Sequence, residues 1–163
     1  FAYLRSTHPD HLALFQALAQ LGCRTLCYLP EVVAGKPEPV RSPRIRYARG
    51  PVHLSLALPQ AQLVVCHAGE ATLAQSFLAG IPVLMLPMQA EQFLMALRVA
   101  QTGAAVHAGA RPRPVDYKAL LSQMLSQGSY REAAQAMARR YQAFTHEHQT
   151  AELVSAFESL IPK

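Results

Sequence analysis

Short apolar blocks separated by polar turns run through the whole chain, and their spacing predicts alternating strands and helices. Residues 63–66 form a short apolar run rich in β-formers, and residues 67–69 interrupt it. From 70 to 78, apolar side chains recur at helical spacing. Gly80 suits a helix C-terminus, and residues 83–86 form a second apolar run. This is the pattern of a βαβ unit, from which parallel sheets are built.

The same alternation extends to both ends of the chain. Strands are expected at residues 1–4, 24–29, 44–48, 63–66, 83–86 and 104–107. Helices are expected after residue 7 with Pro9 in the first turn, at 53–58, at 70–78, from 93 to 103, and through 117–124, 130–141 and 153–160. His8 and His11 are expected to be exposed residues at the start of the first of these helices. The Pro-rich segment 30–43 is predicted to be a loop. We predict one α/β domain over residues 1–163, a doubly wound parallel six-stranded sheet with the strand order 3-2-1-4-5-6.

Residues suited to binding anions and hydroxyls follow two neighbouring predicted strands. The helix after Gly69 should present unpaired N–H groups and a partial positive charge, which attract phosphate. Gly69 lets a ligand approach the backbone, and His67 ends the preceding strand, where open α/β sheets bind ligands. Glu91 and Gln92 follow the next strand, and a carboxylate beside an amide can hydrogen-bond sugar hydroxyls. One sheet edge is therefore predicted to offer a diphosphate cradle beside a sugar-binding pair.

The same residues resemble a known signature. His67-Ala68-Gly69-Glu70-Ala71-Thr72, followed by Gly80-Ile81-Pro82, Pro87 and Glu91-Gln92, is similar to the donor-site pattern of the UDP-glycosyltransferase family with the GT-B architecture. The resemblance covers the whole chain as a C-terminal, Rossmann-like, nucleotide-sugar-binding domain. It implies that an N-terminal acceptor domain is absent from this chain, which agrees with a start at Phe1 in the middle of an apolar run. In the resembled architecture the last helix reaches back to the other domain, so part of its apolar face is expected to be unburied here.

The resemblance also implies a set of donor contacts. The diphosphate-binding residues would be Ser6, His67, Gly69, Glu70, Ala71 and Thr72, with Gly69, Glu70 and Ala71 acting through their backbone N–H groups. The base and ribose would contact Arg49, Val52 and Gln75, and the transferred sugar would contact Glu91 and Gln92. Ordinary structural roles stand beside three of these assignments. Ser6 could cap a helix, Arg49 could be a surface residue, and Glu91 could be a first-turn carboxylate.

The chain departs from the family pattern at five positions. Arg5, Ala68 and Ala71 stand where relatives often have Gly, and Gln75 stands where many have Glu. Arg49 occupies the place of a base-stacking Trp, and the chain has no Trp at all. A guanidinium can stack on a base. The base is therefore left open between uridine and thymidine, and UDP and dTDP sugars are both candidate donors.

Composition limits the cellular setting and the partners. The net charge is +5, and five of the 15 Lys and Arg residues lie between residues 36 and 49. This basic segment is a solvated loop and strand, or alternatively attracts an anionic donor or an acidic membrane surface. Aromatic residues are not interleaved with the charge, so nucleic acid is not an expected partner. Three cysteines in apolar surroundings and no membrane-length apolar run predict a cytoplasmic protein with reduced thiols, with possible peripheral membrane contact of the full-length protein.

The resemblance implies the donor-binding half of an inverting glycosyltransferase. The catalytic base is expected on the missing N-terminal domain, so no catalytic residue is assigned here and the chain alone is expected to be inactive. No DxD-type pair is present, and no metal or cofactor is expected. Residues 146–148 read as an exposed linker, because an i, i+2 pair of histidines does not share a helix face. The alternatives are a cell-wall-precursor transferase, a sugar-nucleotide epimerase, or a non-catalytic nucleotide-binding or scaffold domain.

Overall fold

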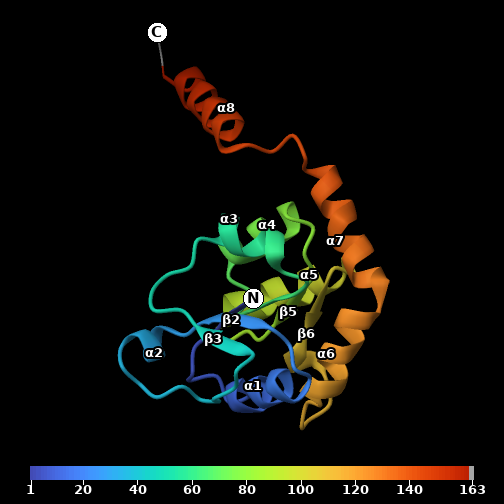
Figure 1. Ribbon diagram of the computed structural model, residues 1–163. Coiled ribbons are helices and arrows are strands. Elements are labelled where there is room, and N and C mark those ends of the chain that lie inside the picture. The colour runs from blue at the N-terminus through green and yellow to red at the C-terminus, as the bar shows by residue number, and fades with distance from the viewer. Residues whose placement is uncertain (162–163) are drawn as a thin grey trace.

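The chain folds around one parallel six-stranded sheet, seen in the computed structural model that describes residues 1–161 (Figure 1). The strands are β1 (Ala2–Tyr3), β2 (Thr25–Tyr28), β3 (Ile45–Tyr47), β4 (Val64–Cys66), β5 (Val83–Met85) and β6 (Ala105–His107). Their order is β3-β2-β1-β4-β5-β6, and every neighbouring pair is parallel. The predicted fold class and strand order are confirmed.

Eight helices and two short 3-10 turns connect and cover these strands within the described residues. The helices are α1 (His11–Gln20), α2 (Pro30–Val33), α3 (Leu54–Ala57), α4 (Glu70–Leu78), α5 (Ala90–Ala100), α6 (Tyr117–Ser126), α7 (Gly128–Arg140) and α8 (His146–Ser159). The 3-10 turns are Leu58–Gln60 and Ala108–Ala110. Most elements therefore lie where the apolar spacing predicts them.

The core is divided by the sheet into two layers, because successive strand side chains point to opposite faces. One layer joins α1 and α6 to strand residues such as Cys27, Val65 and Leu84. The other joins α4, α5 and α7 to Val64 and Met85. β4, β5 and β6 are buried on both faces, as their continuous apolar runs require.

Several predicted boundaries were wrong. The supposed loop 30–43 begins with α2, whose first residue is Pro30, a favoured first helical position. Pro9 precedes α1 rather than lying in its first turn. The expected helix 53–58 is α3 followed by a 3-10 turn that contains Pro59. Residues 146–148 form the first turn of α8, where the Thr145 hydroxyl accepts the His148 N–H at 3.1 Å, rather than a linker.

The helix α5 buries a narrower face than its spacing predicts. Phe93 and Leu97 remain 45% and 41% exposed, whereas Ala96 is fully buried. A small side chain lets α5 lie close to the sheet, so the larger residues stand at its margins.

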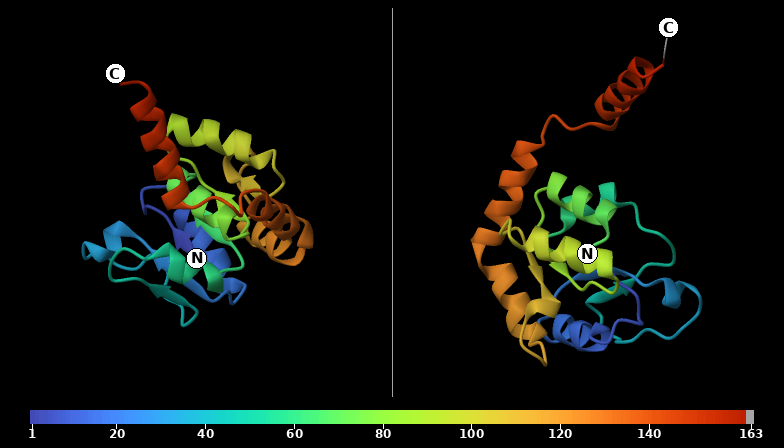
Figure 2. Two further views of the ribbon diagram at one scale, coloured as in Figure 1. Left: turned by 90° about the horizontal axis from the view of Figure 1, so that it is seen from above. Right: turned by 180° about the vertical axis from the view of Figure 1, so that it is seen from behind.

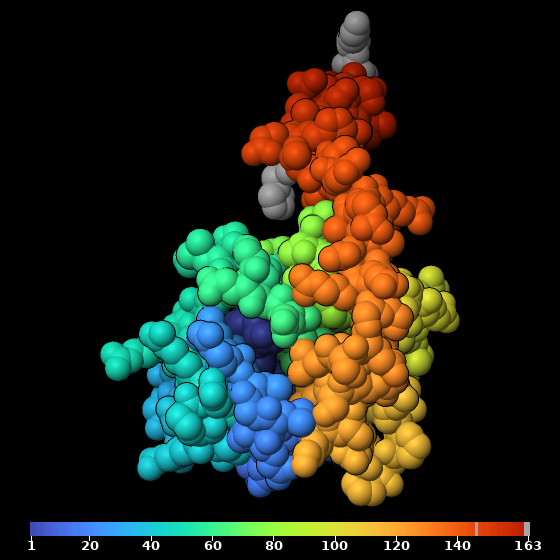
Figure 3. Space-filling model, turned by 45° about the vertical axis from the view of Figure 1, so that its right-hand side comes forward, coloured from blue at the N-terminus to red at the C-terminus, as the bar shows by residue number. Residues whose placement is uncertain are grey.

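The two C-terminal helices leave the body of the domain in succession. The helix α7 runs along its side, and α8 stands away from it (Figures 2 and 3). Leu153 and Phe157 on α8, and Leu160 directly after it, are largely exposed. The unburied apolar face expected for the last helix is thus present.

We expect Leu121→Ala to lower the free energy of unfolding by about 2–5 kcal/mol, because a fully buried leucine of α6 would leave a cavity against α1. Leu125→Ala on the same helix is the matched control, since Leu125 is 41% exposed. Urea unfolding followed by circular dichroism measures both. Equal losses in the two variants would contradict the packing described here.

Candidate functional site

The candidate site lies at the point where the order of the strands reverses. β1 and β4 are neighbours, with Tyr3 in register with Cys66, and their helices pack on opposite faces of the sheet. The turns that follow them, at residues 4–10 and 67–69, therefore meet at one crevice outside the carboxyl ends of the strands. Open α/β sheets bind ligands at such a position.

His67 joins the ends of three adjacent strands through its imidazole ring. Its Nδ1 lies 2.7 Å from the Leu86 carbonyl oxygen, and its Nε2 lies 2.7 Å from the Arg5 backbone nitrogen. A carbonyl can only accept and an N–H can only donate, so Nδ1 carries the proton and Nε2 accepts. Burial lowers the pKa of His67 and outweighs the opposing Leu86 bond. The ring is neutral, and both of its nitrogens are in use.

A carboxylate that the sequence reasoning missed lies against the β1–α1 turn. Glu31, in the first turn of α2, accepts the Ser6 N–H at 3.2 Å and lies 4.0 Å from the Arg5 guanidinium. Burial alone would raise the pKa of Glu31, but its backbone donors and the Arg5 charge hold it below its ordinary value. The sequence predicts a loop at residues 30–43, so it gives Glu31 no role. Only the Leu-Pro-Glu sequence, which is typical of a helix start, indicates that Glu31 lies in a first helical turn.

A second polar network closes the same turn from the side of α1. The Asp10 carboxylate pairs with Arg113 and accepts the Tyr117 hydroxyl at 2.7 Å. Burial opposes ionisation, yet the hydrogen bonds from Tyr117 and Arg113 hold the pKa of Asp10 below its ordinary value. Arg113 and Tyr117 follow β6, so this pair ties the start of α1 to a segment a hundred residues away. Nothing in the local sequence signals such a contact.

His8 lies inside this network and was read from the sequence as exposed. It is only 6% exposed, its Nδ1 accepts the Asp10 N–H at 3.1 Å, and its carbonyl bonds His11 Nδ1 at 2.7 Å. Its ring centroid lies 5.9 Å from that of His67, with the planes at 30°. Burial lowers the pKa of His8 to about 4, against the charge of Asp10. The exposed reading is wrong, because the turn folds back over the ring.

The β4–α4 turn combines a strained residue with an open one. Ala68 has a φ of 63°, a left-handed conformation that an L-residue adopts at a cost of about 1–2 kcal/mol. Gly69 has ordinary angles of −66° and 135°, and a Cβ built there would meet nothing within 4 Å. Ala68, which stands where relatives often have Gly, therefore occupies a backbone conformation that Gly would adopt without strain. Gly69 instead leaves empty space beside the start of α4.

The other predicted diphosphate residues surround that start. Glu70 and Ala71 are exposed at the first turn of α4, and Thr72 is 7% exposed. The first N–H groups of α4 have no partners within the helix, as at any helix start. Ser6, by contrast, has its N–H bonded to Glu31.

The predicted sugar-binding pair lies at the start of α5, after the neighbouring strand β5. Gln92 is half-buried, and its Oε1 accepts the Met88 N–H at 2.9 Å, which leaves its amide NH₂ available. Glu91 is exposed one residue earlier. Gln75, the predicted ribose contact, is exposed on α4. The structure brings these side chains to the same sheet edge as His67.

The predicted base contacts line a hollow beside the end of β3. This depression of about 880 Å³ is lined by Tyr47 of β3 and by Arg49, Gly50 and Val52 of the loop that follows, and Val52 also lines a second depression. His67 and Thr72 do not line this depression. The structure thus groups Arg49 with Val52, but it does not join them to the β4–α4 turn in one cavity.

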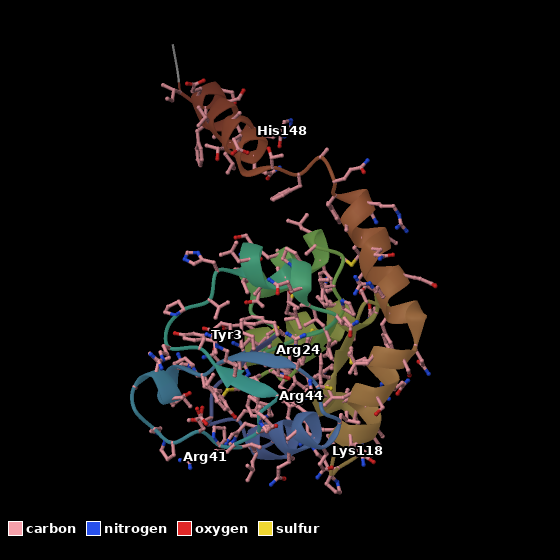
Figure 4. All side chains as sticks on the ribbon, in the orientation of Figure 1. Tyr3, Arg24, Arg41, Arg44, Lys118 and His148 are labelled. Atoms are coloured by element: carbon pink, nitrogen blue, oxygen red, sulfur yellow. The ribbon has the colours of Figure 1, made fainter. Side chains whose placement is uncertain are left out.

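Some basic residues lie away from the crevice. Arg24 and Arg44 precede β2 and β3, so they lie at the amino ends of the strands (Figure 4). Together with Arg46 they line this second depression, of about 1080 Å³, beside the N-terminal residue Phe1, and Arg46 also lines the depression of Arg49. Arg24 and Arg44 therefore cannot attract a donor by direct contact in the crevice, whereas the backbone of Arg5 is bonded to His67 within it.

Two features of the described residues bear on partners. None of the helices in residues 1–161 is long and apolar enough to cross a membrane. No group of His, Cys, Asp or Glu within those residues is arranged to hold a metal ion.

These features define a doubly wound α/β domain with its ligand crevice at the switch point. The chain belongs to the family described as "Erythromycin biosynthesis protein CIII-like, C-terminal domain", whose sequence model matches residues 32–160. No curated protein matches the sequence.

Solved structures of glycosyltransferases share this fold. Spinosyn rhamnosyltransferase SpnG is 24% identical with a TM-score of 0.76, and the match covers 97% of this chain and 45% of that one. Glycosyltransferase VinC in complex with DTDP is 22% identical with a TM-score of 0.76, and the match covers 97% of this chain and 41% of that one. Glycosyltransferase SsfS6 of Streptomyces sp. SF2575, complexed with thymidine diphosphate, is 21% identical with a TM-score of 0.66, and the match covers 95% of this chain and 40% of that one. The chain spans less than half of these enzymes, and its resemblance to a C-terminal GT-B domain is confirmed.

We expect Ala68→Gly to change the free energy of unfolding by less than about 1 kcal/mol, because relief of the left-handed strain is offset by the greater chain entropy of Gly and by the loss of a buried methyl group. Ala74→Gly, at an exposed position inside α4, should lower it by about 1 kcal/mol. Urea unfolding compares the two. Losses of equal size would show that Ala68 is unstrained.

Acidification from pH 6.5 towards 4.5 should destabilise the fold. His8 and His67 have pKa values below 6.5 when folded, so the unfolded chain binds more protons than the folded chain in this window. The free energy of unfolding therefore decreases as the pH is lowered. Glu31 and Asp10, whose pKa values lie below their ordinary 4.5 and 3.8, add to the loss mainly at the acid end of this window and below it. Thermal midpoints measured across the window test this, and His8→Asn should flatten the dependence. A constant midpoint would refute it.

Proposed function

We propose that this chain is the donor-binding domain of a glycosyltransferase that transfers a sugar from a nucleoside diphosphate, UDP or dTDP, to an acceptor hydroxyl with inversion. The chain would hold the donor and stabilise the negative charge that develops on the leaving diphosphate, a contribution that is often the largest in catalysis. The observation that carries the proposal is the open space at Gly69 beside the first turn of α4.

The residues around that space support a diphosphate ligand. Free N–H groups and the helix dipole favour an anion at the start of α4. Thr72 adds a hydroxyl in the first turn of α4, and Arg5 adds a positive charge across the crevice that its ion pair with Glu31 partly offsets. Glu70 would contribute its N–H while its exposed carboxylate points away from the phosphates.

The sugar and the nucleoside would extend from the diphosphate in two directions. Glu91 and the free amide of Gln92 would bind hydroxyls of the transferred sugar. Gln75 would accept a bond from a ribose hydroxyl, and the base would enter the depression beside Arg49 and Val52. VinC and SsfS6 are described with thymidine diphosphate, which favours dTDP as the first donor to test.

The remaining parts of the reaction would come from an N-terminal acceptor domain. That domain would supply the general base, and it would meet the exposed apolar side chains of α8, whose burial could stabilise the contact by roughly 25 cal/mol per Å². We therefore expect the 163-residue chain to bind donor and to transfer no sugar. Donor binding by a helix start needs no metal ion, and we place the enzyme in the cytoplasm, with peripheral membrane contact open.

A non-catalytic nucleotide-binding or scaffold domain is the second candidate. One observation favours it: the Glu31 carboxylate already occupies the Ser6 N–H on the predicted phosphate path. A fixed negative charge there would repel a diphosphate unless Glu31 turns away. The first proposal therefore requires that the donor be held mainly from the α4 side of the crevice.

The test is calorimetric titration of the 163-residue chain with dTDP, UDP, GDP and ADP. We expect saturable binding of a pyrimidine diphosphate, weakened about tenfold in Thr72→Ala by loss of a hydrogen bond to a charged group. Gly69→Val should abolish binding and leave the thermal midpoint unchanged, because its backbone is unstrained and its Cβ meets no atom. Ser122→Ala, exposed on α6, is the control.

Two results would count against this function. Nucleotide binding that Gly69→Val leaves intact would place the ligand elsewhere on the domain. A folded wild-type chain that binds none of the four diphosphates at millimolar concentration would move the scaffold candidate to the front.

A further inference from the structure

We propose that the amino edge of the sheet carries a second anion site, which binds a phosphate group attached to an apolar body. Its cations are Arg24 and Arg44, which directly precede β2 and β3, and Arg46 within β3. All three are exposed, and all three line the depression of about 1080 Å³ described above. Of the predicted donor contacts, Val52 alone lines this depression.

The first step is that the sheet brings the three arginines together. The Thr25 N–H donates to the Arg44 carbonyl at 2.9 Å, so the backbones of Arg24 and Arg44 are neighbours across the two strands. Figure 4 shows these two residues near each other. Arg46 follows two residues later, next to the buried Ile45, and therefore points to the face opposite the α1 layer. Long, exposed stems allow the three guanidinium groups to converge on one anion.

The second step is that these positive charges are not neutralised by the protein. Within residues 1–161, none of the three arginines takes part in an ion pair. None of the residues that line the depression is acidic. Glu38 lines the adjoining depression with Arg46 but forms no ion pair with it. Like charges on neighbouring strands repel and destabilise a sheet, and a bound anion would remove that repulsion.

The third step is the chemistry of the anion. A guanidinium presents a planar fork of N–H donors, which binds phosphate oxygens in pairs. Three positive charges suit a phosphate monoester, which carries close to two negative charges at neutral pH, better than a single carboxylate. The side chains of Gln60 and Gln62 belong to residues that also line the depression, and their amides can donate further hydrogen bonds.

The fourth step is that the rest of the depression is mainly apolar. Leu18, Leu63 and Leu125 are among its lining residues, and so is Leu56 of α3, which is 70% exposed. The helix α3 has no buried residue, so it covers this part of the sheet only loosely. An apolar body attached to the phosphate would shield Leu56 from water. Such a ligand is a soluble phosphate ester or the head group of an anionic phospholipid.

The site is separate from the donor crevice. The crevice lies at the carboxyl ends of β1 and β4, whereas Arg24 and Arg44 lie at the amino ends of their strands. The four residues of β2 span roughly 13 Å between these two edges. Neither His67 nor Thr72 lines the depression. The two sites can therefore be tested independently.

The test is calorimetric titration of the 163-residue chain with phenyl phosphate, a phosphate monoester with an apolar body. The variants are Arg24→Gln and Arg44→Gln, which remove one charge each and leave the donor crevice untouched. Arg41→Gln is the matched control, because Arg41 is equally exposed but does not line the depression, and Figure 4 shows it apart from the other two. Gly69→Val is included to obstruct the donor crevice.

We expect Arg24→Gln and Arg44→Gln each to weaken binding about tenfold, as for the loss of one hydrogen bond between charged groups. Arg41→Gln should stay within about twofold of wild type, because solvent and salt screen an exposed charge that makes no contact. Gly69→Val should bind like wild type. Without ligand, Arg44→Gln should raise the thermal midpoint by about 1–3 °C through relief of repulsion, and saturating phenyl phosphate should reverse that order.

Sedimentation with lipid vesicles identifies the source of the phosphate. Vesicles of phosphatidylcholine alone are compared with vesicles that also contain phosphatidylglycerol. Capture by the anionic vesicles that Arg44→Gln abolishes would assign the site to a membrane phospholipid. Binding of phenyl phosphate without vesicle capture would assign it to a soluble phosphate ester. Either result supports the site.

Three results would overturn the inference without deciding the proposed function against it. Failure of the wild-type chain to bind either phenyl phosphate at millimolar concentration or anionic vesicles would show that the arginines have no such ligand. Equal weakening in Arg41→Gln and Arg44→Gln would reduce the binding to net charge. Binding that Gly69→Val abolishes and the Arg24 and Arg44 variants retain would place the phosphate in the donor crevice.

Discussion

The two hydrogen bonds of the His67 ring are the constraint on which the rest of the site depends. They join the ends of β1, β4 and β5 at the switch point, where no backbone ladder continues. A hydrogen bond of this kind contributes about 0.5–1.5 kcal/mol, and the bond to Leu86 is partly buried whereas the bond from Arg5 is exposed. The ring therefore fixes the separation of the two turns that form the crevice. A neutral, doubly bonded imidazole is suited to this task because it offers one donor and one acceptor in a single plane.

The charged groups around this ring are balanced rather than uniformly positive. Glu31 neutralises Arg5, and Asp10 neutralises Arg113, so both walls of the β1–α1 turn carry ion pairs. An anion entering the crevice meets little net attraction from these pairs at a distance, since the main arginine cluster lies at the opposite edge of the sheet. Short-range donors must then supply the binding energy. This is why free N–H groups matter more here than the net charge of +5 suggests.

The sequence predicts the sheet well and the site less completely, for a physical reason. The strands follow from periodicity, and their order is the one typical of the doubly wound fold class, so both rest on local and general patterns. The roles of His8, Glu31 and Asp10 depend on partners that are distant in the chain, such as Arg113, and no periodicity reports those. The motif places His67 at the correct turn, but which of its nitrogens is free depends on the Leu86 carbonyl and the Arg5 N–H, which only the folded chain brings to it.

The strain at Ala68 connects the packing to the site. A left-handed alanine persists only where its surroundings over-determine its conformation, and here His67 is anchored on one side while α4 packs on the other. Ala68 is itself buried among β4, α4 and α5 residues, so its methyl group offsets part of the strain by filling the core. Gly at this position would relax the backbone but remove that contact. The turn therefore keeps its shape through packing rather than through backbone freedom, and the open space at Gly69 is held beside a rigid neighbour.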